Sequence, residues 1–593
     1  AAKRLALGLR AKAVVALSEL KSAILAQACT RCFGLPTLLS NMVYAEHNAG
    51  TTAASRQFWE SEYLFGMSHE VYQSSLPKCA EGWAWRDLVG VVYQELHIIL
   101  LGRLIRRSSL TGKKGRSKSE AGAALLDSER VSLDDLDSRE EMMTLSMDPR
   151  SSAPVEPGCV VLALACSQQH ACLIETLDSL PQFKPKAAPE KVRAAWQNHS
   201  DRERQRFADR RRNRLRWARA AERLAPPPTP PQGTKVLYDA TDRVEKDVHH
   251  RRFVLAVAAR WPDQLKAFVS VAVGSADYAV VILCAEAPPA EEVEMLANFT
   301  DDDGLPLAVA LVGDPLSSRQ LVRAGLRDAR SVCVLSTAVG AHLEQQDDTA
   351  FGQLASAKAD EASVMLSTAI RAVLRDGGLS TPLVTELKYA QSTRFLDPTP
   401  WWPRRQAEEF AYVQAPVYLS GHCLAESMLY PILGYTYFLP QLVPLFQGLI
   451  DTGEHAPLDD DDGATATFAR DAAAAGAGGG SGLSGTGIPG KSGLGGVADE
   501  ATKAASGHGT DMGLDRLQLW LIPRSFVKEG VIFQDLFNAL LAEGLLALGL
   551  LRAPHEHAPY PYVYTCPLPK TVIRSSDRVY VRVPCTAGIS EDV

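Results

Sequence analysis

The chain lacks a long uninterrupted apolar run. A membrane-spanning helix needs roughly 18 or more consecutive apolar residues with almost no charge. The nearest candidates are Ala267–Cys284, which Asp277 interrupts, and Leu424–Ile450, which contains Glu426 and three prolines. Both segments are therefore predicted to be buried core rather than membrane spans.

Cysteine and excess positive charge are also scarce. Eleven cysteines are scattered over 593 residues, a pattern that is typical of reduced thiols and excludes a disulfide framework. Cys29 and Cys32 form a lone CxxC pair, for which helix packing is favoured over zinc or redox chemistry. The 62 Lys and Arg residues face 69 Asp and Glu residues, which gives a net charge of −7. A generally basic nucleic-acid-binding protein is excluded, because attraction to phosphates needs an excess of cations.

Signatures of catalysis are missing as well. The chain has no GxGxxG between residues 236 and 450, no HExxH and no GxSxG before a helix. Gly485–Ser492 matches the P-loop pattern literally, but Gly-rich sequence without a strand precedes it. The runs Asp301–Asp303 and Asp459–Asp462 lack the alternating ligand spacing of a calcium loop, so solvated turns are favoured. The chain is therefore predicted not to be an enzyme.

The start of the chain carries neither Met nor a signal peptide, since residue 1 is Ala. A length of 593 residues indicates two to four domains at roughly 100–200 residues each. We therefore expect a processed chain or a fragment of a longer one.

The first third of the chain reads as mostly helical. Apolar residues recur at helical spacing over Lys12–Cys29 and over residues 58–76, and Leu88–Ile105 is predicted to be a strongly apolar helix. Residues 106–150 are predicted to form a solvated loop, and Cys159–Ala165 a strand.

A basic linker is predicted next, over residues 187–233. Ten arginines and three acidic residues lie between Arg202 and Arg223, and Pro226–Pro228 follow. A basic helix of this kind could contact anionic lipid, although a solvated connector with a polyproline spacer is favoured.

Residues 236–450 alternate between short apolar strands and amphipathic helical stretches. The predicted strands are Phe268–Val273, Tyr278–Cys284, Leu305–Val312, Ser331–Leu335 and Pro382–Leu387. The predicted helices are Ala290–Phe299, Ser317–Leu326 and Thr349–Leu374, with a further helix over Tyr437–Ile450. This alternation predicts an α/β fold with a parallel, doubly wound sheet.

The end of the chain combines low-complexity sequence with a small α+β unit. Residues 451–513 are predicted to be a flexible, Gly-rich linker. The terminal unit is predicted to contain the helix Phe533–Gly544 and the strands Leu517–Ile522, Leu545–Arg552, Tyr562–Cys566 and Arg578–Val583.

Several colinear segments resemble the RCK domains (regulators of potassium conductance) of Slo-family potassium channels. In the first half these are Leu17–Lys21, Ala26–Cys29, Gly34–Asn41, Trp59, Tyr63, Gly66, Glu70–Tyr72 and residues 88–105. In the second half they are Tyr238–Thr241, Gly313–Ser317, Val332–Ser336, Asp347–Thr349, Pro382–Leu387, Arg394–Asp397, Thr436–Phe438 and residues 531–583. Ordered matches over such a length are stronger than any single motif.

The resemblance implies Rossmann-like, doubly wound RCK domains with helical and small α+β C-terminal lobes and long disordered linkers. It divides the chain into a partial first RCK domain (1–186), the basic linker (187–233), a second RCK core (234–450), the Gly-rich linker (451–513) and the C-terminal lobe of the second domain (514–593).

The resemblance also implies a function. In the family, four subunits form a cytoplasmic gating ring whose ligand-driven expansion pulls on the pore helices. The implied protein is thus a membrane-embedded homotetramer, with its own pore expected upstream of residue 1 and no nucleic-acid partner. Two alternatives stay open, namely a pore-less RCK-type regulator that binds a nucleotide and an NAD-dependent oxidoreductase.

The implied ligand is calcium, but the sequence departs from the family pattern. Calcium-activated members carry an aspartate run directly after Phe-Leu-Asp, whereas here Asp397 is followed by Pro398–Arg405, which is apolar and then cationic. Asp397 is therefore interpreted as a non-binding remnant of that site. The family's other site matches Glu70 and the main chain of Ala45, which become the candidate metal ligands. A plain helix-surface carboxylate is the competing interpretation of Glu70, and sodium or protons remain candidate activators.

Overall fold

The structure is a computed structural model. It describes residues 17–43, 58–106, 143–147, 154–156, 158–177, 236–238, 252–262, 265–274, 278–300, 306–336, 359–396, 411–450, 516–523, 527, 530–556 and 558–583. All of these belong to one of the two compact units into which the chain divides, the unit built from Ala1–Asp451 and Asp515–Pro584.

A seven-stranded sheet forms the middle of the chain, in the order β11-β10-β9-β6-β7-β8-β5. Its strands are β5 (Leu237–Tyr238), β6 (Arg252–Ala258), β7 (Tyr278–Cys284), β8 (Ala308–Val312), β9 (Ser331–Val334), β10 (Leu383–Leu387) and β11 (Cys423–Ala425). Every neighbouring pair is parallel. The chain moves outward from β6 through β7 to β8, returns beside β6 as β9 and continues to β11, which is a doubly wound topology. The predicted α/β fold class is confirmed.

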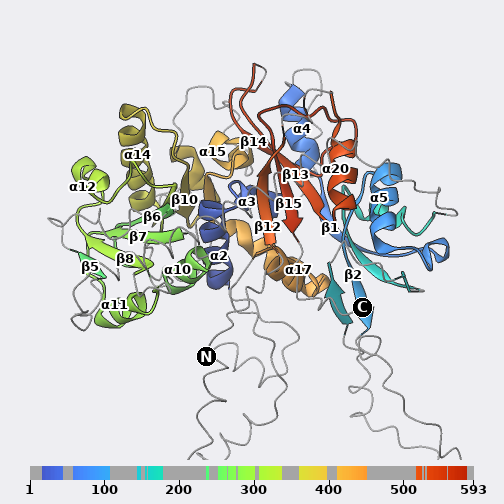
Figure 1. The fold of residues 1–593 in the computed structure, drawn as a ribbon, viewed down its shortest axis with the longest axis horizontal. Helices are drawn as coiled ribbons and strands as arrows, with labels where there is room; N and C mark the ends of the chain where they lie inside the picture. The colour runs from blue at the N-terminus through green and yellow to red at the C-terminus, as the bar shows by residue number, and fades with distance from the viewer. Residues whose placement is uncertain are drawn as a thin grey trace, which may run out of the picture. The chain divides into compact units, whose positions relative to one another are not determined.

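Two helical layers cover this sheet, because successive strand residues face opposite sides. Phe253 and Leu255 of β6 pack with α12 (Ser318–Arg323) and α14 (Glu361–Asp376). Val254 and Ala256 belong to the other core, with α10 (Leu265–Val273) and α11 (Ala290–Ala297). Figure 1 shows the two layers on opposite sides of the green strands. Burial on both faces explains why the strands read as continuous apolar runs.

Two predictions in this region need correction. The predicted strand Phe268–Val273 is the helix α10, and the strand β6 at the centre of the sheet was not predicted. Phe268, Val269 and Ala272 are buried, and α10 packs against both β7 and the helix α2 (Leu17–Thr30). A short helix covered on two sides is apolar enough to be mistaken for a buried strand.

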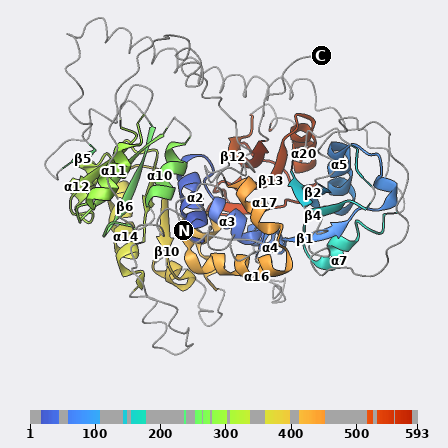
Figure 2. The same cartoon turned by 90° about the horizontal axis from the view of Figure 1, so that it is seen from below.

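Helix α2, from the beginning of the chain, packs against the parallel sheet through β9 and β10 and lies beside α10 (Figures 1 and 2). The carboxyl end of α2 is tied to the strands by two hydroxyls. Ser331 Oγ donates to the Cys29 carbonyl at 2.5 Å, and the Tyr278 hydroxyl donates to the Thr30 carbonyl at 2.7 Å. Segments about 250–300 residues apart in sequence therefore share one core.

Helix α3 (Leu35–Asn41) follows α2 after a turn at Gly34, whose φ is 86°. A Cβ added at Gly421, which also has a positive φ of 71°, would lie 2.3 Å from the Gly34 Cα. The two backbones therefore meet at a distance that only glycine permits. Thr37 and Ser40 extend this contact by hydrogen bonds to the main chain and the hydroxyl of Tyr418.

A four-stranded antiparallel sheet with the order β1-β4-β2-β3 follows in the first part of the chain. Its elements are α4 (Phe58–Met67), β1 (Glu70–Ser75), η2 (Lys78–Ala80), α5 (Trp85–Leu96), β2 (Ile99–Arg106), β3 (Met143–Ser146), β4 (Val160–Ala165) and α7 (Gln168–Cys172). The strand predicted at Cys159–Ala165 is confirmed as β4.

The two long helices predicted here are wrong in their second halves. The pattern over residues 58–76 is helix α4 followed by strand β1, and Leu88–Ile105 is the end of α5 followed by β2. Helix α5 stops because His97 adopts a left-handed conformation with φ 58°. Residues 98–101 are all buried, so no polar face marked the change from helix to strand.

Residues 411–450 contain short elements. These are η5 (Ala411–Gln414), α15 (Pro416–Leu419), η6 (Glu426–Leu429), α16 (Tyr430–Phe438) and α17 (Leu442–Leu449), preceded by η4 (Ala390–Phe395). The single helix predicted over Tyr437–Ile450 is instead the end of α16 and the whole of α17, which Leu439 and a turn at Pro440 separate. Within the described residues, no helix is both long enough and apolar enough to cross a membrane.

The terminal sheet is antiparallel, in the order β12-β15-β13-β14. Its elements are β12 (Arg516–Leu521), α20 (Phe533–Ala542), β13 (Leu546–Arg552), β14 (Tyr562–Thr565) and β15 (Arg578–Val583), which confirms the predicted order. Strand β14 packs on α3 and α4, and α20 packs on α5. The two ends of the described chain are thus folded together.

Candidate functional site

Glu70, the candidate metal ligand of the sequence analysis, opens strand β1 and is buried, at 4% exposure. Its carboxylate accepts two hydrogen bonds from phenol hydroxyls. Tyr72 donates to Oε2 at 2.8 Å, and Tyr435 of α16 donates to Oε1 at 2.8 Å. Burial raises the pKa of Tyr435, and its bond to Glu70 raises that pKa further, so the phenol stays protonated and remains a donor. Glu70 is therefore not a helix-surface carboxylate, which corrects that competing interpretation.

The residue before Glu70 is also buried. His69 has 0% exposure, and its Nδ1 lies 2.8 Å from the Phe65 carbonyl, to which it must donate because a carbonyl only accepts. Nε2 is then unprotonated, and it has no hydrogen-bond partner in the described part of the chain. Burial lowers the pKa of His69 to about 4, since a second proton would place a charge where nothing accepts it.

The described residues at Glu70 do not complete a calcium site. Calcium takes six to eight oxygen ligands at roughly 2.3–2.6 Å. Around Glu70 the structure describes one carboxylate and two phenol oxygens, and among the described residues no group of three or more His, Cys, Asp or Glu could hold a metal. The other candidate ligands, the main chain of Ala45 and the side chain of Asp397, lie outside the described residues.

A second ionic cluster lies at the carboxyl edge of the parallel sheet. Lys21 Nζ of α2 is 2.7 Å from Glu386 Oε1 and 3.0 Å from Glu426 Oε2. Glu386 Oε2 also accepts the main-chain N–H of Ser336 at 2.9 Å. Burial opposes the charged form of Lys21, but the two carboxylates raise its pKa overall. The cluster therefore ties the first helix of the described chain to the ends of β9, β10 and β11.

The same edge is where a doubly wound sheet binds a dinucleotide, in the turn after its first central strand. That turn follows β6 and reads Ala259-Arg260-Trp261-Pro262, without glycine. Arg260 instead makes a 3.6 Å ion pair with Glu286. A pyrophosphate needs close backbone approach at this turn, which the arginine and tryptophan side chains do not offer. The geometry therefore disfavours the NAD-dependent oxidoreductase.

Three of the other motifs noted in the sequence cannot be placed relative to Glu70. Gly485–Ser492, Asp301–Asp303 and Asp459–Asp462 lie outside the described residues. Cys29 and Cys32 are buried within the core that includes α2. Burial raises the pKa of Cys32, which disfavours the thiolate that metal binding or redox chemistry requires.

Tyr435, Lys21 and Glu386 were not predicted as site residues from the sequence. Glu386 did carry a signal, because it is a charged residue inside the apolar strand Leu383–Leu387, and a buried charge needs a partner. The partner Lys21 lies 365 residues away, and Tyr435 lies 365 residues from Glu70, so no local pattern could have joined either pair.

Two family models match separate parts of the chain. The family model described as "Calcium-activated BK potassium channel alpha subunit" matches residues 12–103. The model described as "Calcium-activated potassium channel slowpoke-like RCK domain" matches residues 254–400. A search of curated proteins finds no match.

Two solved structures are similar to the chain. "Structure of the human SLO3 gating ring" is 16% identical with a TM-score of 0.53, over 97% of this chain and 76% of that one, which shows a shared fold. "Crystal Structure of the GsuK RCK domain" is 9% identical over 87% and 61% of the two chains, and its TM-score of 0.19 is too low to support an argument.

The doubly wound sheet and the family matches define the class of the protein, which is an RCK-domain region. Over residues 12–103 and 254–400 the chain is therefore similar to Slo-type calcium-activated potassium channels and their RCK domain, the resemblance predicted from the sequence. Together with the fold shared with the human SLO3 gating ring, these matches support the gating-ring region of a calcium-activated-type potassium channel.

Proposed function

We propose that the chain forms the ligand-sensing part of a homotetrameric channel subunit and transmits the binding of an intracellular cation to a potassium pore in the same subunit. The proposed cation is calcium, and the proposed ligand residue is Glu70. The proposed domain division is a first RCK domain ending near residue 186 and a second RCK domain that starts near 234 and ends with the lobe 514–593.

The observation that carries the proposal is the hydrogen bond between Tyr435 and Glu70. It joins strand β1, in the antiparallel sheet, to helix α16, which follows the last strand of the parallel sheet. Figure 2 shows α16 running past α4 and β1. A change at this carboxylate is therefore felt by two parts of the chain at once.

Coupling follows from competition for one oxygen. A cation that takes Glu70 Oε1 competes with the Tyr435 hydroxyl for it. Binding and the contact between β1 and α16 are then linked, and a ligand shifts a conformational equilibrium only by its differential affinity for the two states. Weakening the Tyr435 bond should accordingly tighten cation binding, and an ion that leaves the bond intact should not shift the equilibrium.

The test is calorimetric titration of the purified 593-residue chain with calcium chloride. We expect Glu70→Gln to raise the calcium Kd at least tenfold, because a charged ligand is lost, and Tyr435→Phe to lower it. The matched control is Glu95→Gln, which removes an exposed carboxylate on α5 and should leave Kd within twofold. Equal Kd values for the wild type and Glu70→Gln would place the calcium site elsewhere. If the wild type gives no binding heat with calcium but does give binding heat with sodium, sodium rather than calcium is the ligand.

Self-association is supported by an exposed aromatic surface on α16. Tyr437 is 84% and Phe438 82% exposed, and Leu433 on the same helix is 41% exposed. Contiguous exposed apolar side chains mark surfaces that are covered by a partner. Light scattering should give a tetramer for the wild type and a smaller mass for Tyr437→Ser/Phe438→Ser. A monomeric wild type with intact secondary structure would contradict the homotetramer while leaving the cation site open to its own test.

A further inference from the structure

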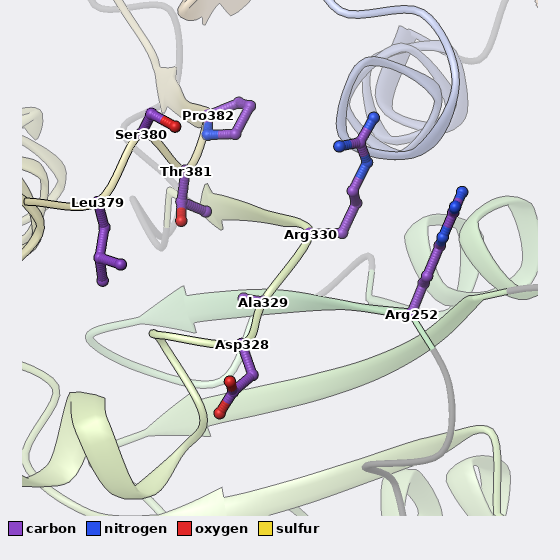
Figure 3. A pocket seen from close by; sticks show the side chains of 8 residues that line it. All are labelled: Arg252, Asp328, Ala329, Arg330, Leu379, Ser380, Thr381 and Pro382. Atoms are coloured by element: carbon purple, nitrogen blue, oxygen red, sulfur yellow. The ribbon is translucent and has the colours of Figure 1, made fainter.

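A hollow of about 540 Å³ opens at the amino edge of the parallel sheet, away from Glu70 and from the carboxyl-edge cluster. Arg252 is the first residue of β6, Arg330 directly precedes β9, and Pro382 directly precedes β10. The full lining is Arg252, Asp328, Ala329, Arg330, Leu379, Ser380, Thr381 and Pro382, as Figure 3 shows.

Positive charge collects at this hollow. The side chains of Arg252 and Arg330 project to the same side of the strands in Figure 3, and both residues are exposed. A third guanidinium, that of Arg578 at the start of β15, is close enough for electrostatic repulsion. Burial lowers the pKa of Arg578, and the charge of Arg330 lowers it further.

No carboxylate in the described part of the chain forms an ion pair with Arg252, Arg330 or Arg578. Asp328 is the one acidic side chain in the lining, and Figure 3 shows its carboxylate directed away from the two guanidinium groups. Because no ion pair among the described residues occupies Arg252 and Arg330, an anion bound beside them gains attraction without breaking an existing pair.

The walls of the hollow are held in place by main-chain hydrogen bonds. The Arg330 N–H donates to the Phe253 carbonyl at 2.9 Å, and the Val332 N–H donates to the Pro382 carbonyl at 2.8 Å. Ser380 and Thr381, which line the hollow across from the arginines in Figure 3, add hydroxyl groups as neutral donors. Arginine forks together with hydroxyl donors match the oxygens of a phosphate group.

We propose that the hollow at the amino edge of the parallel sheet binds a phosphate-bearing anion through Arg252 and Arg330, with Arg578 adding long-range attraction. The site is separate from the proposed cation site at Glu70, since it lies on β6, β9 and β10. A free polyphosphate, such as that of a nucleotide, and a phosphorylated lipid headgroup present the same chemistry, and the experiment separates them.

The experiment is calorimetric titration of the purified 593-residue chain with sodium tripolyphosphate. Arg252→Ala/Arg330→Ala should raise Kd at least tenfold, because two charge-assisted hydrogen bonds are lost. Asp328→Asn should lower Kd, because a like charge near the anion is removed. The matched control, Arg319→Ala/Arg394→Ala, removes two exposed arginines outside the hollow and should leave Kd within twofold. Circular dichroism melting of each variant confirms folding.

Two further titrations assign the source of the phosphate. If the ligand is a free nucleotide, ATP should bind to the wild type. Vesicles that contain phosphatidylinositol bisphosphate should then co-sediment the wild type and the double arginine variant to the same extent. A lipid ligand predicts the reverse. Absence of tripolyphosphate binding to the wild type, or equal weakening in the control variant, would overturn the proposal.

Discussion

Two glutamates that lie close together in sequence are held in contrasting ways. Glu62 on α4 is paired with a cation, since Arg552 Nη2 is 3.0 Å from its Oε1, and Arg552 Nη1 lies 2.6 Å from Asp577. Tyr562 also donates to Glu62. Glu70 at the start of β1 instead accepts hydroxyl bonds from Tyr72 and Tyr435.

The difference separates a structural contact from an adjustable one. The guanidinium of Arg552 is 1% exposed, so breaking its pairs would leave buried charges unsolvated. The phenol of Tyr435 is half-buried, and a hydroxyl bond contributes modestly, so it can be exchanged for another ligand. We infer that the Glu62 cluster fastens the terminal sheet to α4, whereas the hydrogen bond of Tyr435 to Glu70 can be exchanged when a ligand binds.

The largest effect is expected for Arg552→Ala, which leaves both Glu62 and Asp577 without their cation. The free energy of unfolding should fall by about 3–5 kcal/mol, because uncompensated charges stay buried. Urea denaturation measures this loss, with Arg319→Ala as an exposed control that should change by no more than about 0.5 kcal/mol. If Arg552→Ala lowers the free energy of unfolding no more than Arg319→Ala does, Glu62 is not held more firmly than Glu70.

A smaller loss is expected for Tyr562→Phe, which removes one hydroxyl donor from the buried Glu62. A hydrogen bond to a charged group contributes about 1.5–3 kcal/mol, so unfolding free energy should fall within that range. Tyr437→Phe, at an 84% exposed position, serves as the control in the same urea titration and should have no measurable effect. If Tyr562→Phe leaves the free energy of unfolding unchanged, Arg552 alone is a sufficient partner for the Glu62 carboxylate.

Acid should destabilise the folded protein through His69, the buried residue that precedes Glu70. Its pKa of about 4 in the folded protein lies below the ordinary value of about 6.5, so the unfolded chain binds more protons between those values. The contribution of the neutral His69 to the free energy of unfolding is fully present above about pH 6.5. It is lost as the pH falls below that value, at about 1.4 kcal/mol per pH unit.

The measurement is the difference in unfolding free energy between the wild type and His69→Asn at two pH values. The advantage of the wild type at pH 7 should shrink by about 2 kcal/mol at pH 5. His97 and His170, which also bear electrostatically on His69, are unchanged in the variant and cancel from the difference. A difference that does not vary with pH would show that His69 keeps an ordinary pKa.

The smallest effect is expected for Tyr435→Phe, which removes the bond between α16 and Glu70. The unfolding free energy should fall by about 1.5 kcal/mol, the lower end of the range for a hydrogen bond to a charged group, because Tyr435 is only half-buried. Measured beside Tyr562→Phe, it ranks the two phenol contacts directly. A Tyr435→Phe loss equal to or above that of Tyr562→Phe would make the Glu70 contact structural rather than adjustable.

The parallel sheet was largely predictable from sequence. Strands such as Tyr278–Cys284 are short apolar runs between amphipathic helices, and that alternation is specific to a doubly wound fold. The errors fell where an element shows little polar sequence. Helix α10 carries only Lys266 and Ser270 as polar residues on its outer side, and residues 98–101 between α5 and β2 are all buried, so periodicity could not tell helix from strand.

The candidate site was predictable only in part. Glu70 was identified through its family resemblance, while its phenol partner Tyr435 and the arginine hollow were not. Arg252 and Arg330 stand 78 positions apart and became neighbours only because β6 and β9 pair in parallel. Strand order, not local sequence, brought their charges together.

The sequence by itself determined the class of fold, the family resemblance and the order of most elements, because these follow from local apolar patterns and colinear motifs. The tertiary structure decided which carboxylate is paired with Arg552, which accepts bonds from tyrosine hydroxyls, and where Arg252 and Arg330 meet. Those properties depend on contacts between segments hundreds of residues apart. Burial and charge pairing at such contacts follow from packing, which no local stretch of sequence specifies.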